Sequence, residues 1–212
     1  VSTSFINPLQ TINFNVLGSS NVLESCRINK IKNLVYITSD KCYLNDNRKS
    51  TYKENDRLGG KDVYSSSKAA AEVIFYSYYK SFLNKDKKVK YASARAGNVI
   101  GGGDMKKDRI VPDIIKSIIA KKTILLRNPK AIRPWQHVLE SLYGYLVLGS
   151  FLINNRLPKN RIPNWNFGPN PKNYKNVLSL TKKIISNWDL KKRVIKIKKQ
   201  NFKESSILKL NN

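Results

Sequence analysis

The stretch Leu34-Val35-Tyr36-Ile37-Thr38-Ser39-Asp40-Lys41 decides the fold, because a run of apolar, β-favouring residues passes directly into four polar ones. The run from Leu34 to Ile37 has no polar alternation, which is typical of a strand in a buried parallel sheet. Polar side chains beyond the carboxyl end of such a strand lie where open α/β sheets bind their ligands. The stretch therefore predicts a parallel sheet with a binding site immediately after residue 37.

A second polar motif, Tyr64-Ser65-Ser66-Ser67-Lys68, lies downstream of the first. A tyrosine and a lysine four residues apart share one face of a helix. There the ammonium group can stabilise the phenolate and lower the pKa of the phenol, which makes the tyrosine a general base for a hydroxyl proton. The same spacing also fits a solvated helix face in a lysine-rich chain. The surrounding motifs must therefore decide between a catalytic pair and a solvated face.

Helical and extended segments alternate along the rest of the chain. Asn7 and Pro8 are predicted to start a helix from Leu9 to Arg27, and Asn45–Lys61 is predicted to be a loop. Further helices are expected at Tyr64–Tyr79, Ile110–Ala120, Val138–Leu152 and Val177–Trp188, and further strands at Val89–Ala94, Thr123–Leu126 and Trp165–Gly168. This alternation predicts an α/β fold with a Rossmann-like, doubly wound parallel sheet.

The composition fits a folded, strongly basic protein. The 212 residues carry a formal net charge of +26, and 41% of them are hydrophobic, which is enough for a packed core. The charge fits either a polyanion-binding module or lysines scattered over a solvated surface. A basic block occurs only at Lys191–Lys199, where Val194, Ile195 and Ile197 alternate with lysines and predict an edge strand. Scattered lysines are the stronger interpretation, and they would attract phosphate-bearing small molecules.

The rare residue types exclude several classes of protein. Two cysteines, Cys26 and Cys42, offer no metal-ligand spacing and no disulfide framework, and the single histidine, His137, argues against a Ser-His-Asp triad. The sequence contains no apolar run of membrane-spanning length and does not begin with a signal-peptide pattern. We therefore expect a protein of the reducing cytoplasm, with no metal site and no membrane or nucleic-acid partner.

Two further segments could meet phosphate groups. Gly101-Gly102-Gly103 could cradle a phosphate, but no Lys-Ser/Thr follows as in a P-loop, so a turn is expected there. Arg127 and Arg133 flank a proline-containing loop. They could clamp a diphosphate, or they could be two solvated surface arginines.

The order of the motifs resembles the extended short-chain dehydrogenase/reductase family. Within that family the chain looks like the CDP-glucose 4,6-dehydratases along nearly its whole length. The motifs that carry this resemblance are Thr38-Ser39-Asp40-Lys41-Cys42-Tyr43, Glu54-Asn55-Asp56-Arg57-Leu58-Gly59-Gly60, Tyr64-Ser65-Ser66-Ser67-Lys68-Ala69, Arg95-Ala96-Gly97-Asn98-Val99-Ile100-Gly101-Gly102-Gly103-Asp104, and Arg127-Asn128-Pro129 followed by Arg133-Pro134-Trp135-Gln136-His137-Val138. The pair Asp40-Lys41 separates this group from other nucleotide-sugar 4,6-dehydratases, which usually carry Asp-Glu at these two positions.

The chain also departs from the family pattern. Met105 stands where tryptophan is expected, and Val63 stands where proline usually precedes the tyrosine. The glycine-rich fingerprint that binds the cofactor pyrophosphate in this family is absent. We therefore expect a fragment that lacks the N-terminal βαβ half of its Rossmann domain and keeps a small C-terminal substrate-binding lobe. The expected limits are residues 1–100 for the remaining NAD-binding domain and 101–212 for the interleaved nucleotide-sugar lobe.

The resemblance implies conversion of CDP-D-glucose to CDP-4-keto-6-deoxy-D-glucose and water, through transient oxidation by tightly bound NAD. It implies a general base at Tyr64 and a water-releasing acid at Asp40, with Lys41 in the place of the usual glutamate base. The other roles that it implies are a hydrogen bond from Ser39 to the sugar, cofactor contacts at Thr38, Tyr64, Lys68 and Gly97, and substrate contacts at Asn98, Arg127 and Arg133.

The resemblance leaves alternatives open. Another nucleotide-sugar epimerase or dehydratase would share most of these motifs, although an epimerase needs no acid for water loss. An inactive fragment would also fit, because the cofactor fingerprint is missing, and a polyanion-binding module is the remote alternative. Relatives of this kind commonly form homodimers through the helix of the Tyr-x-x-x-Lys motif and the helix before the catalytic strand, and supply deoxysugars for O-antigen lipopolysaccharide. No motif reveals the preferred base.

Overall fold

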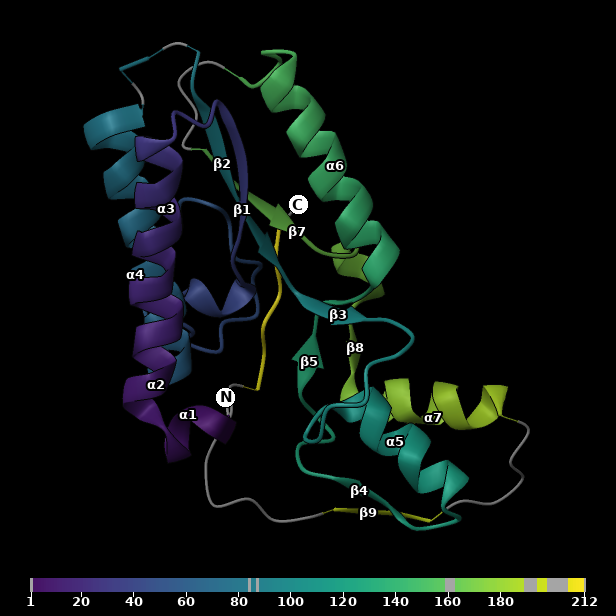
Figure 1. The fold of residues 1–212 in the computed structure, drawn as a ribbon. Coiled ribbons are helices and arrows are strands. Elements are labelled where there is room, and N and C mark those ends of the chain that lie inside the picture. Colours follow the sequence, from purple (N-terminus) through teal and green to yellow (C-terminus); the bar gives the residue numbers. More distant parts are fainter. Residues whose placement is uncertain are drawn as a thin grey trace.

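A three-stranded parallel sheet lies at the centre of the computed structural model, which describes residues 2–83, 85–86, 88–158, 163–188, 194–197 and 206–211 (Figure 1). The sheet has the order β1-β2-β7, from Asn33–Ile37, Lys90–Ala96 and Asn164–Phe167. Ile37 lies opposite Ala94, and Ala96 lies opposite Phe167. The three carboxyl ends therefore meet at one edge of the sheet, which confirms the predicted parallel fold.

Helices cover both faces of this sheet (Figure 1). On one face lie α2 (Pro8–Ile12), α3 (Gly18–Ile28) and α4 (Val63–Tyr78), and on the other lies α6 (Val138–Ile153). The first interface buries Leu23, Phe75 and Tyr91, and the second buries Ala92, Ala94, Leu148 and Leu152. Cover on both faces buries β2 from Tyr91 to Ala96 and confirms the doubly wound arrangement.

The remaining elements form a smaller lobe beside the sheet (Figure 1). Its helices α5 and α7 pack with β4 around the buried residues Ile114, Ile118, Ile124 and Leu126. The bounds are α5 Ile110–Ile119, α7 Val177–Asn187, β4 Ile124–Leu126 paired with β9 Ile195–Ile197, β5 Ile132–Arg133 paired with β8 Lys175–Asn176, and β3 Asn98–Ile100 paired with β6 Trp135–His137. Because β7 and α6 return to the main sheet, residues 101–212 interleave with it, and a division at residue 100 stays a prediction.

The helix before β1 is not regular along its length. After α1 (Ser2–Ile6), the predicted helix starts at Pro8 as expected, but Asn13–Leu17 forms a π-helical turn between α2 and α3. Short π-helical segments often mark functional sites. The other short segments are the π-helix Tyr79–Leu83 after α4 and the 3₁₀ helices Asp40–Cys42 and Pro171–Asn173.

Two expectations about strands need qualification. β1 is not fully buried as predicted, since Ile37 is 53% exposed and β1 pairs only with β2 among the described residues. The predicted edge strand near the C-terminus is confirmed at Ile195–Ile197, where β9 pairs in parallel with β4. The flanking residues 191–193 and 198–199 of the basic block lie outside the described residues. The predicted turn at the glycine triplet is confirmed, with Gly103 at φ 78°.

The loop after β1 is held by the C-terminal segment. The amide of Tyr52 donates to the carbonyl of Lys209 at 2.8 Å, and Asn45 donates to the carbonyl of Ile207 at 2.8 Å. Leu208 and Leu210 are buried in one cluster with Cys42, Tyr43 and Tyr52. A long polar loop is thereby fixed over the carboxyl end of β1, close to the candidate site.

A capping box fixes the start of α4. The carboxylate of Asp62 accepts a hydrogen bond from the amide of Ser65 at 3.0 Å, and the hydroxyl of Ser65 accepts one from the amide of Asp62 at 3.3 Å. A cap of this kind satisfies amide groups that the first turn of a helix leaves without partners. It places Tyr64 in the first turn of the helix.

We expect Asp62→Ala to lower the free energy of unfolding by roughly 1 kcal/mol, because the amide of Ser65 loses its acceptor. Urea titration followed by circular dichroism measures this change. Asp62→Asn is the matched control, since asparagine caps about as well as aspartate. Equal destabilisation by both substitutions would show that the carboxylate contributes charge rather than a cap.

Candidate active site

The residues after β1 form a tight polar turn. The amide of Lys41 donates to the Ser39 hydroxyl at 3.2 Å, and that hydroxyl donates to Asp40 Oδ1 at 3.1 Å. The side chain of Asp40 is buried, and its Oδ2 atom has no hydrogen-bond partner among the described residues. A buried carboxylate oxygen without a partner is costly, so its presence marks a place where a ligand would supply one.

Helix α4 brings Tyr64 to this turn. The pKa of Tyr64 is raised, first because burial disfavours the charged phenolate and next because the carboxylate of Asp40 repels it. A hydrogen bond with Ser39 and the charge of Arg109 act in the opposite direction. The structure thus joins Ser39, Asp40 and Tyr64, but the expectation of a lowered tyrosine pKa is wrong, because burial and Asp40 outweigh the Ser39 hydrogen bond and the charge of Arg109.

The two predicted lysines lie beside these groups. The ammonium of Lys68 is 5.9 Å from the centroid of the Tyr64 ring, and burial lowers its pKa. The ammonium of Lys41 is 3.7 Å from Asp40 Oδ1. The five predicted catalytic residues therefore come from two segments that meet at one edge of the sheet.

Two residues predicted to contact a cofactor have packing roles of their own. The hydroxyl of Thr38 donates a short hydrogen bond to Glu72 on α4, so it points into the protein. Gly97 follows β2, and a Cβ atom there would lie 2.5 Å from Cγ of Pro134. A glycine at this position lets two chain segments approach closely, whatever its contact with a ligand.

The three predicted substrate residues lie in or beside the smaller lobe. Asn98 begins β3, immediately after Gly97 at the sheet edge. Arg133 is buried in β5 and donates to the carbonyl of its neighbour Ile132 at 2.9 Å. Arg127 donates to the carboxylate of Asp108 at 3.0 Å and to its carbonyl at 2.9 Å. Arg127 is therefore paired with a carboxylate.

Sequence reasoning assigned no role at the site to several residues of this region. Asn15 in the π-helical turn donates to the hydroxyl of Ser67 at 2.9 Å, next to Lys68. Arg109, at the start of α5, acts on the pKa of Tyr64. Glu72 and Arg95 form a fully buried ion pair of 2.6 Å behind the site. The spacing of Glu72, four residues after Lys68, was the only available signal, because the other contacts join segments distant in sequence.

Within the described residues, no group of three or more His, Cys, Asp or Glu side chains is arranged to hold a metal ion. The described helices also include none that is both long and apolar enough to cross a membrane.

Comparison with known proteins defines the class to which this fold and site belong. Residues 1–149 match the model of the NAD dependent epimerase/dehydratase family. The chain therefore belongs to the NAD dependent epimerase/dehydratase family.

Particular relatives narrow the comparison. The chain is 42% identical to the CDP-glucose 4,6-dehydratase of Salmonella typhimurium over 193 residues, which are 89% of this chain and 53% of that protein. It is 30% identical to the dTDP-D-glucose 4,6-dehydratase of Dictyostelium discoideum over 58% of this chain and 29% of that one. The chain thus spans about half or less of the length of these curated relatives.

Solved structures agree on the fold. A UDP-N-acetylglucosamine 4-epimerase from Methanobrevibacter ruminantium superposes with a TM-score of 0.81 at 18% identity, over 100% of this chain and 64% of that one. A double mutant of the dTDP-glucose 4,6-dehydratase from Streptomyces venezuelae, solved with NAD bound, superposes with a TM-score of 0.81 at 15% identity. The match covers 99% of this chain and 61% of that one. These likenesses confirm the predicted Rossmann-like α/β fold.

The geometry predicts that Asp40→Asn lowers the pKa of Tyr64, because the phenolate is the form that the Asp40 carboxylate repels. The phenol would then ionise at lower pH. An absorbance titration of the variant, minus the titration of the same variant carrying Tyr64→Phe, isolates this tyrosine from the others. An unchanged or higher pKa in Asp40→Asn would contradict the arrangement described here.

Proposed function

We propose that this chain carries the catalytic part of a CDP-glucose 4,6-dehydratase, which converts CDP-D-glucose to CDP-4-keto-6-deoxy-D-glucose with loss of water. The single observation that carries the proposal is the unpartnered Oδ2 atom of buried Asp40, beside Ser39 and Tyr64. Loss of water from C6 requires a buried acid near the groups that act at C4, and this carboxyl group meets that need.

The cofactor of this reaction would be NAD, which accepts a hydride from the sugar and later returns it. The residues fit one end of that molecule. Tyr64 and Lys68 share a face of α4, and among the described residues no carboxylate forms an ion pair with the Lys68 ammonium. That ammonium would hold the hydroxyls of the nicotinamide ribose. Gly97 and Thr38 would line the same region through their backbones.

Side chains of this chain would carry out the proton transfers of the reaction. Tyr64 would take the proton of the sugar O4 hydroxyl, and Ser39 would hydrogen-bond the same oxygen. Burial and Asp40 raise the pKa of Tyr64, so Tyr64 would act as the base only where a bound positive charge favours its phenolate. A proton passing from the Lys41 ammonium to the Asp40 carboxylate, whose Oδ1 atom lies 3.7 Å away, would leave a neutral acid and a neutral amine. Asp40 would then protonate the departing C6 hydroxyl while the Lys41 amine takes the C5 proton, which restores both charged forms.

Substrate binding would rest on the positively charged side of the site. Arg133 and Asn98 would meet the diphosphate, because guanidinium and amide groups donate to phosphate oxygens. Arg127 would join them only by giving up part of its pairing with Asp108. The choice of cytidine over other bases rests on the 42% identical relative and on Asp40-Lys41.

The test uses the chain together with whatever residues its coding region encodes on either side, incubated with NAD and with CDP-, UDP- or dTDP-glucose. We expect a product that has lost one water from CDP-glucose alone, detected by mass spectrometry. Tyr64→Phe should reduce turnover at least ~10³-fold while CDP-glucose still binds, since the phenol only transfers a proton. Normal turnover by Tyr64→Phe would overturn the mechanism, and an isomerised sugar without water loss would indicate an epimerase.

We also propose that the chain forms a homodimer through α2, α4 and the π-helical turn between α2 and α3. These segments pack against one another and expose large apolar side chains. Leu9 is 75% exposed, Phe14 71%, Leu17 56% and Val73 52%. Large apolar side chains exposed on neighbouring segments are typical of a protein–protein interface.

Phe14→Glu should convert the dimer to monomer, because a charge at the centre of an apolar interface has no partner there. Sedimentation velocity measures the change. Leu146→Glu on α6 is the matched control, since Leu146 is 74% exposed on the opposite face of the sheet. Dissociation by the control instead would move the interface to α6.

A further inference from the structure

A fully buried ion pair lies directly behind the candidate site. Glu72 on α4 and Arg95 on β2 are each 1% exposed, and Glu72 Oε2 lies 2.6 Å from Arg95 Nη2. Burial works against the charged form of Arg95, but the charge and hydrogen bond of Glu72 outweigh it and raise the pKa of the guanidinium. Buried ion pairs seldom stabilise a fold more than apolar residues of the same size would. A role in geometry is therefore a stronger explanation than a role in stability.

The carboxylate of Glu72 joins the two segments that carry the site. One oxygen accepts the short hydrogen bond of Thr38, the residue directly before Ser39. The other accepts from Arg95 and, at 3.0 Å, from the hydroxyl of Ser93. Glu72 itself lies one helical turn after Lys68 and two turns after Tyr64. The carboxylate thus connects the helix of Tyr64 to the strand end of Ser39 and Asp40.

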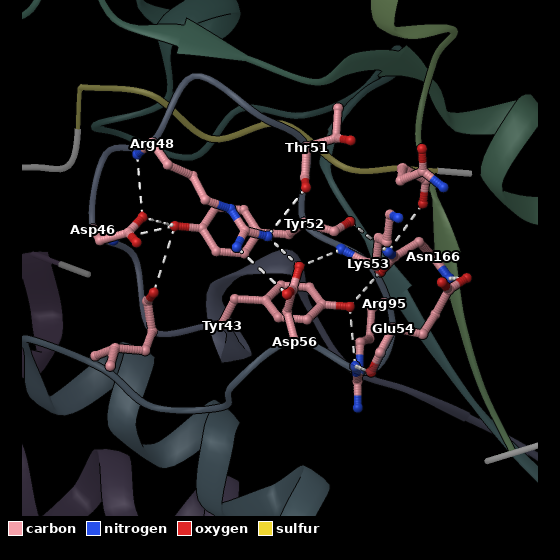
Figure 2. A network of polar contacts seen from close by, with 12 residues as sticks. Tyr43, Asp46, Arg48, Thr51, Tyr52, Lys53, Glu54, Asp56, Arg95 and Asn166 are labelled. Carbon is pink, nitrogen blue, oxygen red and sulfur yellow. Dashed lines mark hydrogen bonds and ion pairs between the residues drawn. The ribbon is translucent and has the colours of Figure 1, made fainter.

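Arg95 extends the same network into the loop after β1 (Figure 2). Its Nη1 atom donates to the hydroxyl of Tyr43 at 2.9 Å and to the carbonyl of Glu54 at 2.8 Å. The hydroxyl of Tyr43 in turn donates to Asn166 Oδ1 on β7 at 2.7 Å. Tyr43 follows Lys41 by two residues, so the network holds the polar turn from behind as well as from the helix.

We propose that Glu72, paired with Arg95, is a positioning residue that sets the placement of Tyr64 relative to Ser39 and Asp40. Glu72 does not itself touch the reacting groups; it acts through Thr38 on one side and through its own helix on the other. An error of about 1 Å in the placement of catalytic groups costs on the order of 100-fold in rate. The consequence for rate rests on the proposed function, whereas the consequence for geometry does not.

The test compares Glu72→Gln with the double variant Glu72→Met/Arg95→Met in the chain that turns over substrate. Glu72→Gln should lower kcat roughly 10- to 100-fold with KM within about 3-fold, because binding groups remain while alignment is lost. The double variant replaces both charges by apolar side chains, so its urea midpoint should return toward that of the unsubstituted protein while kcat stays low. A double variant with full kcat would show that the pair serves stability alone and would overturn the proposal.

A second measurement does not depend on turnover. The pKa of Tyr64, isolated by subtracting the Tyr64→Phe titration in each background, should fall toward about 10 in both Glu72 variants, as burial and the contact with Asp40 are lost. Ser93→Ala is the matched control, because it removes one bond to Glu72 and leaves the link through Thr38 intact. It should keep the pKa of Tyr64 and change kcat less than about 3-fold.

If no nucleotide sugar is turned over by the unsubstituted protein, the proposed function fails but the titration still decides the inference. A Tyr64 pKa that is the same in the unsubstituted protein and in both Glu72 variants would overturn the positioning role. A fall in both Glu72 variants, with no fall in Ser93→Ala, would support it.

Discussion

Parallel pairing of β1 with β2 is the constraint on which the rest of the site depends. Because Ile37 lies opposite Ala94, the chain leaves both strands at the same edge of the sheet. The polar turn after β1 and the glycine after β2 are therefore neighbours in space although they are distant in sequence. Helix α4 connects these strands and packs on the sheet, so its first turn lies over the same edge (Figure 1).

Electrostatics at this edge are arranged around one buried carboxylate. Burial raises the pKa of Tyr64 and lowers the pKa of Lys68, and the Asp40 carboxylate adds to the effect on Tyr64. Both shifts favour the neutral forms of the tyrosine and the lysine. A site in which buried groups are held away from their ordinary pKa values by specific neighbours is typical of acid–base chemistry. Such a site would respond strongly to a bound cation or an anionic substrate.

The surroundings of the site are held by long-range contacts rather than by local structure. Asn166 on β7 accepts from Tyr43 and donates to the carbonyls of Tyr52 and Asn211, each at 3.0 Å (Figure 2). One amide side chain thereby joins the sheet, the loop after β1 and the C-terminal segment. In the same loop, Arg48 pairs with Asp56 and lies 4.0 Å from the centroid of the Tyr52 ring. The shape of this long polar loop thus depends on partners outside the loop as well as on contacts within it.

The sequence by itself determined the parallel α/β fold, the order of its elements and the meeting of the Ser39 and Tyr64 motifs, because these follow from local periodicity and from the direction of parallel strands. It failed where an outcome depends on partners brought from elsewhere in the chain. The Tyr64–Lys68 spacing gave no sign that burial and Asp40 would raise the tyrosine pKa. Nothing around Leu34–Ile37 revealed that Ile37 would be exposed, or that Asn13–Leu17 would form a π-helical turn. The tertiary structure alone decided these features and the burial of Glu72 with Arg95, since charge, exposure and hydrogen bonding depend on distance in space.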